Sequence, residues 1–115
     1  MPFPHILSAL PKRRYQYGEY LITLLSDVSS DDSTSYLYII AVVREGHDKP
    51  EVYITCEPCR SNEPQLYRIR VISEHEEHNI SEDTQWKNEQ NFCDFALQGI
   101  KQMFNLSDED PILLS

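Results

Sequence analysis

The feature of this sequence that most constrains its fold is a series of short runs rich in aromatic and β-branched residues. The runs occupy residues 15–28, 36–45, 51–56 and 65–73, with polar residues, glycine or proline between them. Runs of this length and composition are typical of β-strands. The segments that join them are short, whereas a parallel pair of strands needs a connection of about a dozen residues. We therefore expect a four-stranded antiparallel meander.

From residue 81 onward the apolar residues recur every three or four positions. This period predicts an amphipathic helix with a wide apolar face. We expect the helix to run from about Thr84 to Asn105. The predicted fold class is therefore α+β: a four-stranded antiparallel β-meander with one C-terminal α-helix packed on one face. The apolar face of this helix consists of Trp86, Phe92, Cys93, Ala96, Leu97, Ile100, Met103 and Phe104.

The 115 residues are the length of one domain. We divide it into an N-terminal extension (1–14), the antiparallel sheet (15–73), the helix (84–105) and an acidic and apolar tail (106–115). The longest apolar run, residues 36–43, is too short to cross a bilayer, so we do not expect a membrane protein. The first residues carry prolines, and their charges follow the apolar residues, the reverse of a secretory signal. We expect a cytoplasmic protein.

The first two predicted strands carry apolar residues on both faces. Ile22 and Leu24 alternate with Leu21 and Leu25, so each face of the sheet needs a cover. One amphipathic helix covers a single face. The other face needs the N-terminal segment, the Ile112-Leu113-Leu114 tail or a second chain. Because monomers rarely expose a large apolar surface, we expect a homodimer with two-fold symmetry.

Charge bears directly on the kind of partner. Ten basic and nineteen acidic residues give a net charge of −9 and a pI near 4.7, which disfavours nucleic-acid binding. Residues 74–115 hold only two basic but ten acidic residues. This acidity is either a solvated surface or a docking surface for a basic partner. We expect a small, non-catalytic protein-interaction module. The expected partner-binding residues are Glu82, Asp83, Glu89, Asp94, Asp108, Glu109 and Asp110.

Metal binding is the alternative function. Cys56 and Cys59, followed by His75 and His78, have a spacing similar to that of zinc sites. The predicted strands oppose a joint site, because His75 would lie about 30 Å from the cysteines at a strand rise of about 3.3 Å per residue. An independent site at the two histidines, with Glu74 or Glu77, is left as an alternative. We assign no metal and no cofactor.

Catalysis has little support in the sequence. A nucleophile elbow and a phosphate-binding loop are both missing, and three glycines are too few for a backbone phosphate cradle. A redox role for Cys56 and Cys59 is disfavoured because no helix follows them. The basic cluster 12–14 precedes two tyrosines and suggests at most an anion or RNA site. If a cleft forms between subunits, its polar groups would be Tyr15, Tyr17, His47, Arg68 and Arg70.

Overall fold

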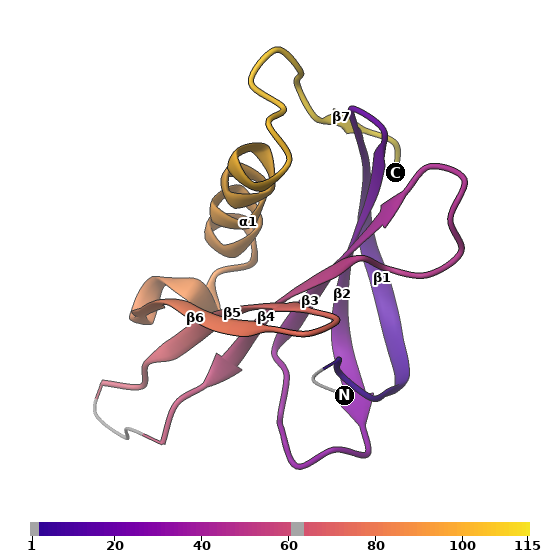
Figure 1. The fold of residues 1–115 in the computed structure, drawn as a ribbon. Helices are drawn as coiled ribbons and strands as arrows, with labels where there is room; N and C mark the ends of the chain where they lie inside the picture. The colour runs from indigo at the N-terminus through magenta and orange to yellow at the C-terminus, as the bar shows by residue number, and fades with distance from the viewer. Residues whose placement is uncertain (1–2, 61–63) are drawn as a thin grey trace.

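The computed structural model describes residues 3–60 and 64–115, which form a single antiparallel sheet with a helix against one face (Figure 1). Within these residues there are seven strands in the order β6-β5-β4-β3-β2-β1-β7. The α+β class, the antiparallel sheet and the single α-helix are confirmed, whereas the expected number of four strands is wrong. The elements are β1 (Ile6–Tyr17), β2 (Tyr20–Ser30), β3 (Tyr38–Arg44), β4 (Val52–Pro58), β5 (Tyr67–Ser73), β6 (Glu77–Asp83), a 3₁₀-helix η1 (Thr84–Lys87), α1 (Glu89–Met103) and β7 (Ile112–Leu113).

The first additional strand arises because the run 15–28 is a hairpin. Gly18 adopts a φ of 58°, and the chain reverses between Tyr17 and Tyr20, which pair with each other. Strand β1 then extends back to Ile6, through the segment expected to be an extension. Pro11 is compatible with this strand because β7 does not extend to it and because the pairing with β2 is irregular between Pro11 and Arg13, and proline is tolerated at sheet edges and bulges.

The other two additional strands lie at the two edges of the sheet. Strand β6 pairs with β5. Its sequence, EHNISED, shows no alternation of apolar residues, because most of its side chains are exposed. Strand β7 pairs with β1 at Tyr15 and Gln16 only. The segment around His78 is therefore a strand where a solvated loop was expected. Of the expected loop 57–64, Glu57 and Pro58 belong to β4, and residues 61–63 lie outside the described residues.

The helical segment begins where the sequence predicts, but it is divided in two. The Asp83 side chain accepts a hydrogen bond from the backbone of Gln85 and caps η1. The chain then becomes extended at Asn88, whose side chain accepts from the Asn91 backbone and caps α1. No helix formed by the described residues has the length and apolar composition needed to cross a membrane.

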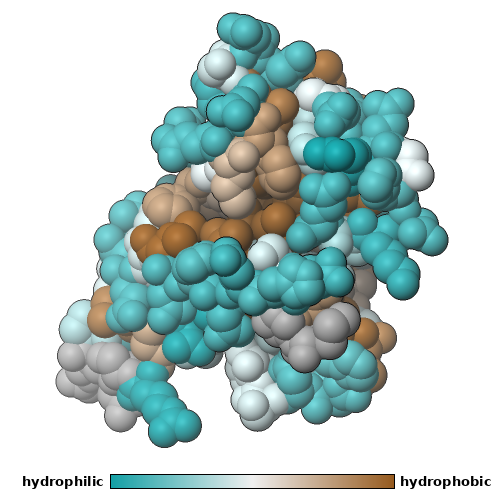
Figure 2. Space-filling view, in the orientation of Figure 1, coloured by the Kyte–Doolittle hydropathy of each residue, from teal (hydrophilic) through white to brown (hydrophobic). Residues whose placement is uncertain are grey.

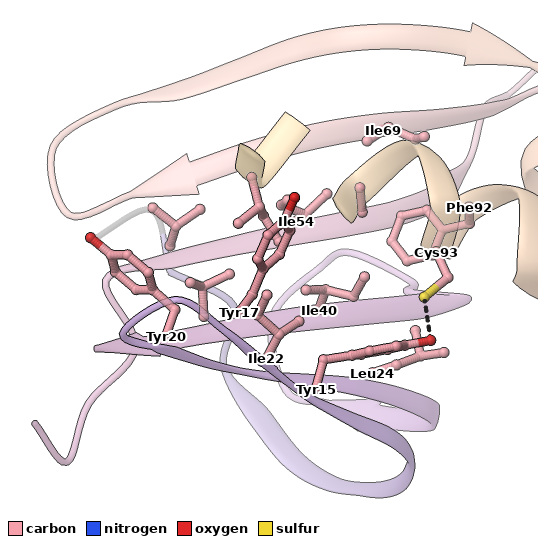
Figure 3. Packing of buried hydrophobic residues seen from close by; sticks show 14 of the residues in the cluster. Tyr15, Tyr17, Tyr20, Ile22, Leu24, Ile40, Ile54, Ile69, Phe92 and Cys93 are labelled. Atoms are coloured by element: carbon pink, nitrogen blue, oxygen red, sulfur yellow. Dashed lines mark hydrogen bonds between the residues drawn. The ribbon is translucent and has the colours of Figure 1, made fainter. Parts of the chain in front are cut away.

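The main core lies between α1 and the sheet (Figure 3). Phe92 stacks on Tyr38 of β3 with ring centroids 5.6 Å apart. Cys93 lies 3.6 Å from the hydroxyl of Tyr15, which the dashed line in Figure 3 marks. At the far end of the helix, Phe104 stacks on Tyr20 of β2 at 4.2 Å. These contacts fix the helix over the β1–β3 part of the sheet.

The opposite face of the sheet is covered at its centre by the same chain. Phe3 packs edge-on against Tyr53 of β4, with ring centroids 5.3 Å apart, and Ile39 and Ile72 on this face are fully buried. Asp32 anchors this cover, because its carboxylate accepts hydrogen bonds from the backbone of His5 and from the hydroxyl of Tyr36. A second chain is therefore not needed over this centre. The homodimer stays a prediction.

Candidate interaction groove

Helix α1 does not lie parallel to the outer strands, and this leaves part of the sheet uncovered. The helical segment, η1 followed by α1, is attached to β6 at its first end, where the Trp86 indole of η1 donates a 3.0 Å hydrogen bond to Ser81. At the other end Phe104 lies against Tyr20 of β2. Because the segment crosses from β6 to β2, the helix diverges from β6 along its length (Figure 1). On the helix side, Val71 of β5 and Ile80 of β6 are consequently only partly covered, whereas Ile54 of β4 stays buried.

The gap between α1 and β6 is a groove of about 560 Å³. A band of apolar residues is visible in the space-filling view, between more polar regions (Figure 2). The walls come from α1 and β6, and the floor comes from β4 and β5. The lining residues are Ile54, Val71, His78, Ile80, Phe95, Ala96, Gln98, Gly99, Gln102 and Met103.

Ile80 and Met103 lie on opposite walls of this groove and are unusually exposed for large apolar residues. Their exposed fractions are 43% and 40%. Ile80 is the extra residue of a β-bulge, since Ser81 pairs with Ile69 and Asn79 pairs with Arg70 while Ile80 has no partner across the strand. Bulges alter the direction in which side chains point and are common near functional sites. Here the bulge places an isoleucine in the groove.

The borders of the groove are polar. Gln98 and Gln102 line it on the helix side. On the strand side, His78 lies 3.3 Å from the carboxylate of Glu76. The turn between β5 and β6 carries Glu74 and Glu76, so this border is acidic.

The seven acidic residues predicted to bind a partner lie in two regions and do not form one surface. Glu82, Asp83, Glu89 and Asp94 lie on β6 or near the start of α1, whereas residues 108–110 follow the helix. Three of them have structural contacts: Asp83 caps η1, Glu89 lies 3.7 Å from Arg13, and Asp94 accepts a hydrogen bond from Gln90. In the second region, Glu109 lies beside Gly18 of the β1–β2 turn.

A buried polar cluster occupies the face opposite the helix. Glu57 is 1% exposed and accepts hydrogen bonds from Thr55, Arg68 and Arg70. A polar pocket of about 510 Å³ lies beside it, lined by Glu57, Arg68 and the loop 33–35 among others. Because both arginines already bind this carboxylate, the cluster is best explained as a structural ion pair.

The polar residues suggested for a subunit cleft or an anion site are not brought together. Tyr15 and Tyr17 are buried in the core beneath α1, whereas Arg68 and Arg70 bind Glu57 on the other face. In the basic cluster 12–14, Arg13 donates a 2.7 Å hydrogen bond to Gln90 of α1. His47 lies in the exposed turn between β3 and β4.

The cysteines and histidines are also separated. Cys56 is buried and donates to the carbonyl of Trp86, and burial raises its pKa to about 12, so the reactive thiolate is disfavoured. Burial also raises the pKa of Cys59. His75 lies in the turn at the opposite end of β5. Among the described residues, no group of three or more histidine, cysteine or acidic side chains is placed to hold a metal ion.

Comparisons of the chain with models of protein families, with curated proteins and with solved structures find no match. The functional interpretation therefore rests on the geometry of the groove and on the charge around it. Sequence reasoning did not identify the groove, because two of its residues, His78 and Ile80, belong to the unpredicted strand β6. The apolar Ile80 among polar residues was the available signal.

Proposed function

We propose that this protein is a non-catalytic protein-interaction module that holds an apolar segment of a partner in the groove between α1 and β6. The observation that carries the proposal is the groove itself, in which large apolar side chains are exposed on both walls. Binding sites of this kind combine an apolar lining with a few polar groups that fix orientation. His78, Gln98 and Gln102 supply those polar groups.

Charge indicates what kind of partner the groove receives. Both walls belong to the part of the chain, residues 74–115, in which ten acidic residues outnumber two basic ones. Complementary charge accelerates encounter between proteins and disfavours partners of like charge. The partner segment is therefore apolar where it enters the groove and basic beside it. An anionic membrane surface or a nucleic acid would be repelled by the same charge.

The test is a selection from a random peptide display library on the wild-type protein, followed by measurement of Kd for two variants. Ile80→Glu places a charge in the groove and should weaken the selected peptides by about tenfold or more, because an unpaired charge is costly in an apolar contact. The control is Leu10→Glu, which makes the same kind of change at a residue of β1 that is 52% exposed. It should leave Kd unchanged.

Two results would contradict the proposal. One is a set of selected peptides whose affinity is the same for the wild type and for both variants, which places their binding elsewhere. The other is a failure of Ile80→Glu to fold. Because Ile80 is 43% exposed and lies at a bulge of an edge strand, we expect its melting temperature to stay close to that of the wild type.

A further inference from the structure

Building on the proposed function, we propose that the occupant of the groove is an amphipathic α-helix of another protein, with basic residues beside its apolar stripe, which packs closely against Gly99 of α1. The strands that line the groove are β4, β5 and β6, and together they span about 10 Å at the usual spacing of neighbouring strands. One α-helix with its side chains is about 10–12 Å wide.

The backbone of the occupant also needs hydrogen-bond partners, which favours a helix. Only three of the lining residues, His78, Gln98 and Gln102, offer polar side chains. An extended segment in the groove would leave many of its N–H and C=O groups against apolar atoms without partners. A helix pairs these groups internally. A strand that pairs with the outer edge of β6 would lie beyond the groove and would leave it open.

A glycine, Gly99, lies in the middle of α1. Glycine in a helix interior destabilises the helix relative to alanine. Nothing in the described part of the chain requires it at position 99: its φ is not in the positive range, and a Cβ there would meet none of the described atoms within 4 Å. Gly99 lines the groove, and a glycine there lets a second helix approach the backbone of α1 closely.

A second copy of this chain does not supply the occupant. The one α-helix formed by the described residues, α1, already buries its apolar side chains Phe92, Cys93 and Ile100 against its own sheet. The C-terminal segment is also engaged, since Leu114 donates a hydrogen bond to the Arg14 carbonyl at the opposite edge of the sheet. The acidic border beside His78 favours a partner with basic residues.

The experiment uses two peptide libraries of about the length of α1, 15 residues. One is constrained to be helical by side-chain staples and carries lysine or arginine beside a randomised apolar stripe. The other carries prolines that prevent helix formation. Both are selected on the full chain. We expect the helical library to yield peptides whose binding is lost in Ile80→Glu, and the proline library to yield none.

Gly99→Ala then separates binding from folding. The added methyl group should raise the melting temperature by about 2–5 °C, since the site is open and helical. The same group should weaken the helical peptides by about fivefold or more, because it occupies the space that the partner backbone needs. A matched control is Lys101→Ala, on the same helix but outside the groove. It removes a positive charge and should leave binding of a basic helix unchanged or make it tighter.

The outcomes distinguish the two proposals. Groove-dependent peptides from the proline library alone would overturn the helical occupant and leave the interaction module standing. Helical peptides that bind Gly99→Ala as well as the wild type would overturn the close approach at Gly99. If neither library yields a peptide sensitive to Ile80→Glu, the occupant and the proposed function both fall.

Discussion

The carboxylate of Glu57 is buried on the face of the sheet opposite α1, where an unpaired charge would be very costly. Arg70 donates to one of its oxygens at 2.7 Å and Arg68 donates to the other at 2.9 Å. Thr55, itself fully buried, donates a further hydrogen bond. The four residues lie next to one another on β4 and β5, because Thr55 pairs with Arg70 and Glu57 pairs with Arg68 across the strands. The register of these two strands is thus tied to one ion pair.

Glu57→Gln should lower the free energy of unfolding by about 2–4 kcal/mol. The amide keeps the shape of the side chain but leaves the guanidinium of Arg70, whose side chain is 12% exposed, without its main counter-charge. Urea denaturation followed by circular dichroism measures this loss. The control is Glu45→Gln at an exposed position in the β3–β4 turn, where we expect a change within about 0.5 kcal/mol. Equal stability of the two variants would refute the structural role of Glu57.

At the scale of elements, the β1–β2 hairpin depends on Gly18. Its φ of 58° is a conformation that other residues adopt only with strain, and a Cβ there would lie 2.9 Å from the Cδ2 of Leu106. Leu106 is buried and follows α1. The turn therefore holds the first hairpin and the end of the helical segment together.

Gly18→Ala should destabilise the fold by about 1–3 kcal/mol, through backbone strain and the displacement of Leu106. Gly46→Ala is a matched control, because Gly46 also has a positive φ, 87°, but no atom lies within 4 Å of its added Cβ. The difference between the two variants in thermal unfolding reports the contact with Leu106. A loss for Gly18→Ala no larger than that for Gly46→Ala would exclude this contact as a source of stability.

The same elements show which parts of the fold the sequence predicts. Runs of aromatic and β-branched residues mark β3, β4 and β5, and apolar residues that recur every three or four positions mark the helical segment. Gly18 was the available sign of the first hairpin, between two runs that both alternate. Strand β6 carries no such sign, because an edge strand with exposed side chains needs only backbone hydrogen bonds to β5. The groove depends on β6 and on the angle of α1, and neither follows from local periodicity.

At the scale of the whole molecule, the net charge of −9 leaves two explanations for the acidic residues. If they only keep the protein dissolved, their positions are interchangeable. If they attract a basic partner to the groove, those nearest to it matter most. Glu76 lies 3.3 Å from His78 of the groove, and Glu74 belongs to the same exposed turn. Asp108 and Asp110 flank Glu109, which contacts the β1–β2 turn.

Two double variants separate these explanations, because each replaces two acids by lysine and changes the net charge equally. Glu74→Lys with Glu76→Lys should slow association of the groove-binding peptides by about tenfold at low salt, with little effect on the melting temperature. Asp108→Lys with Asp110→Lys should slow it much less. Stopped-flow association measured from low to high ionic strength gives both rates, and the difference should vanish at about 1 M salt, where the Debye length is about 3 Å. Equal slowing by the two variants would show that the acidic residues act only through net charge. Unfolding of the first variant would show instead that its acidic residues stabilise the fold.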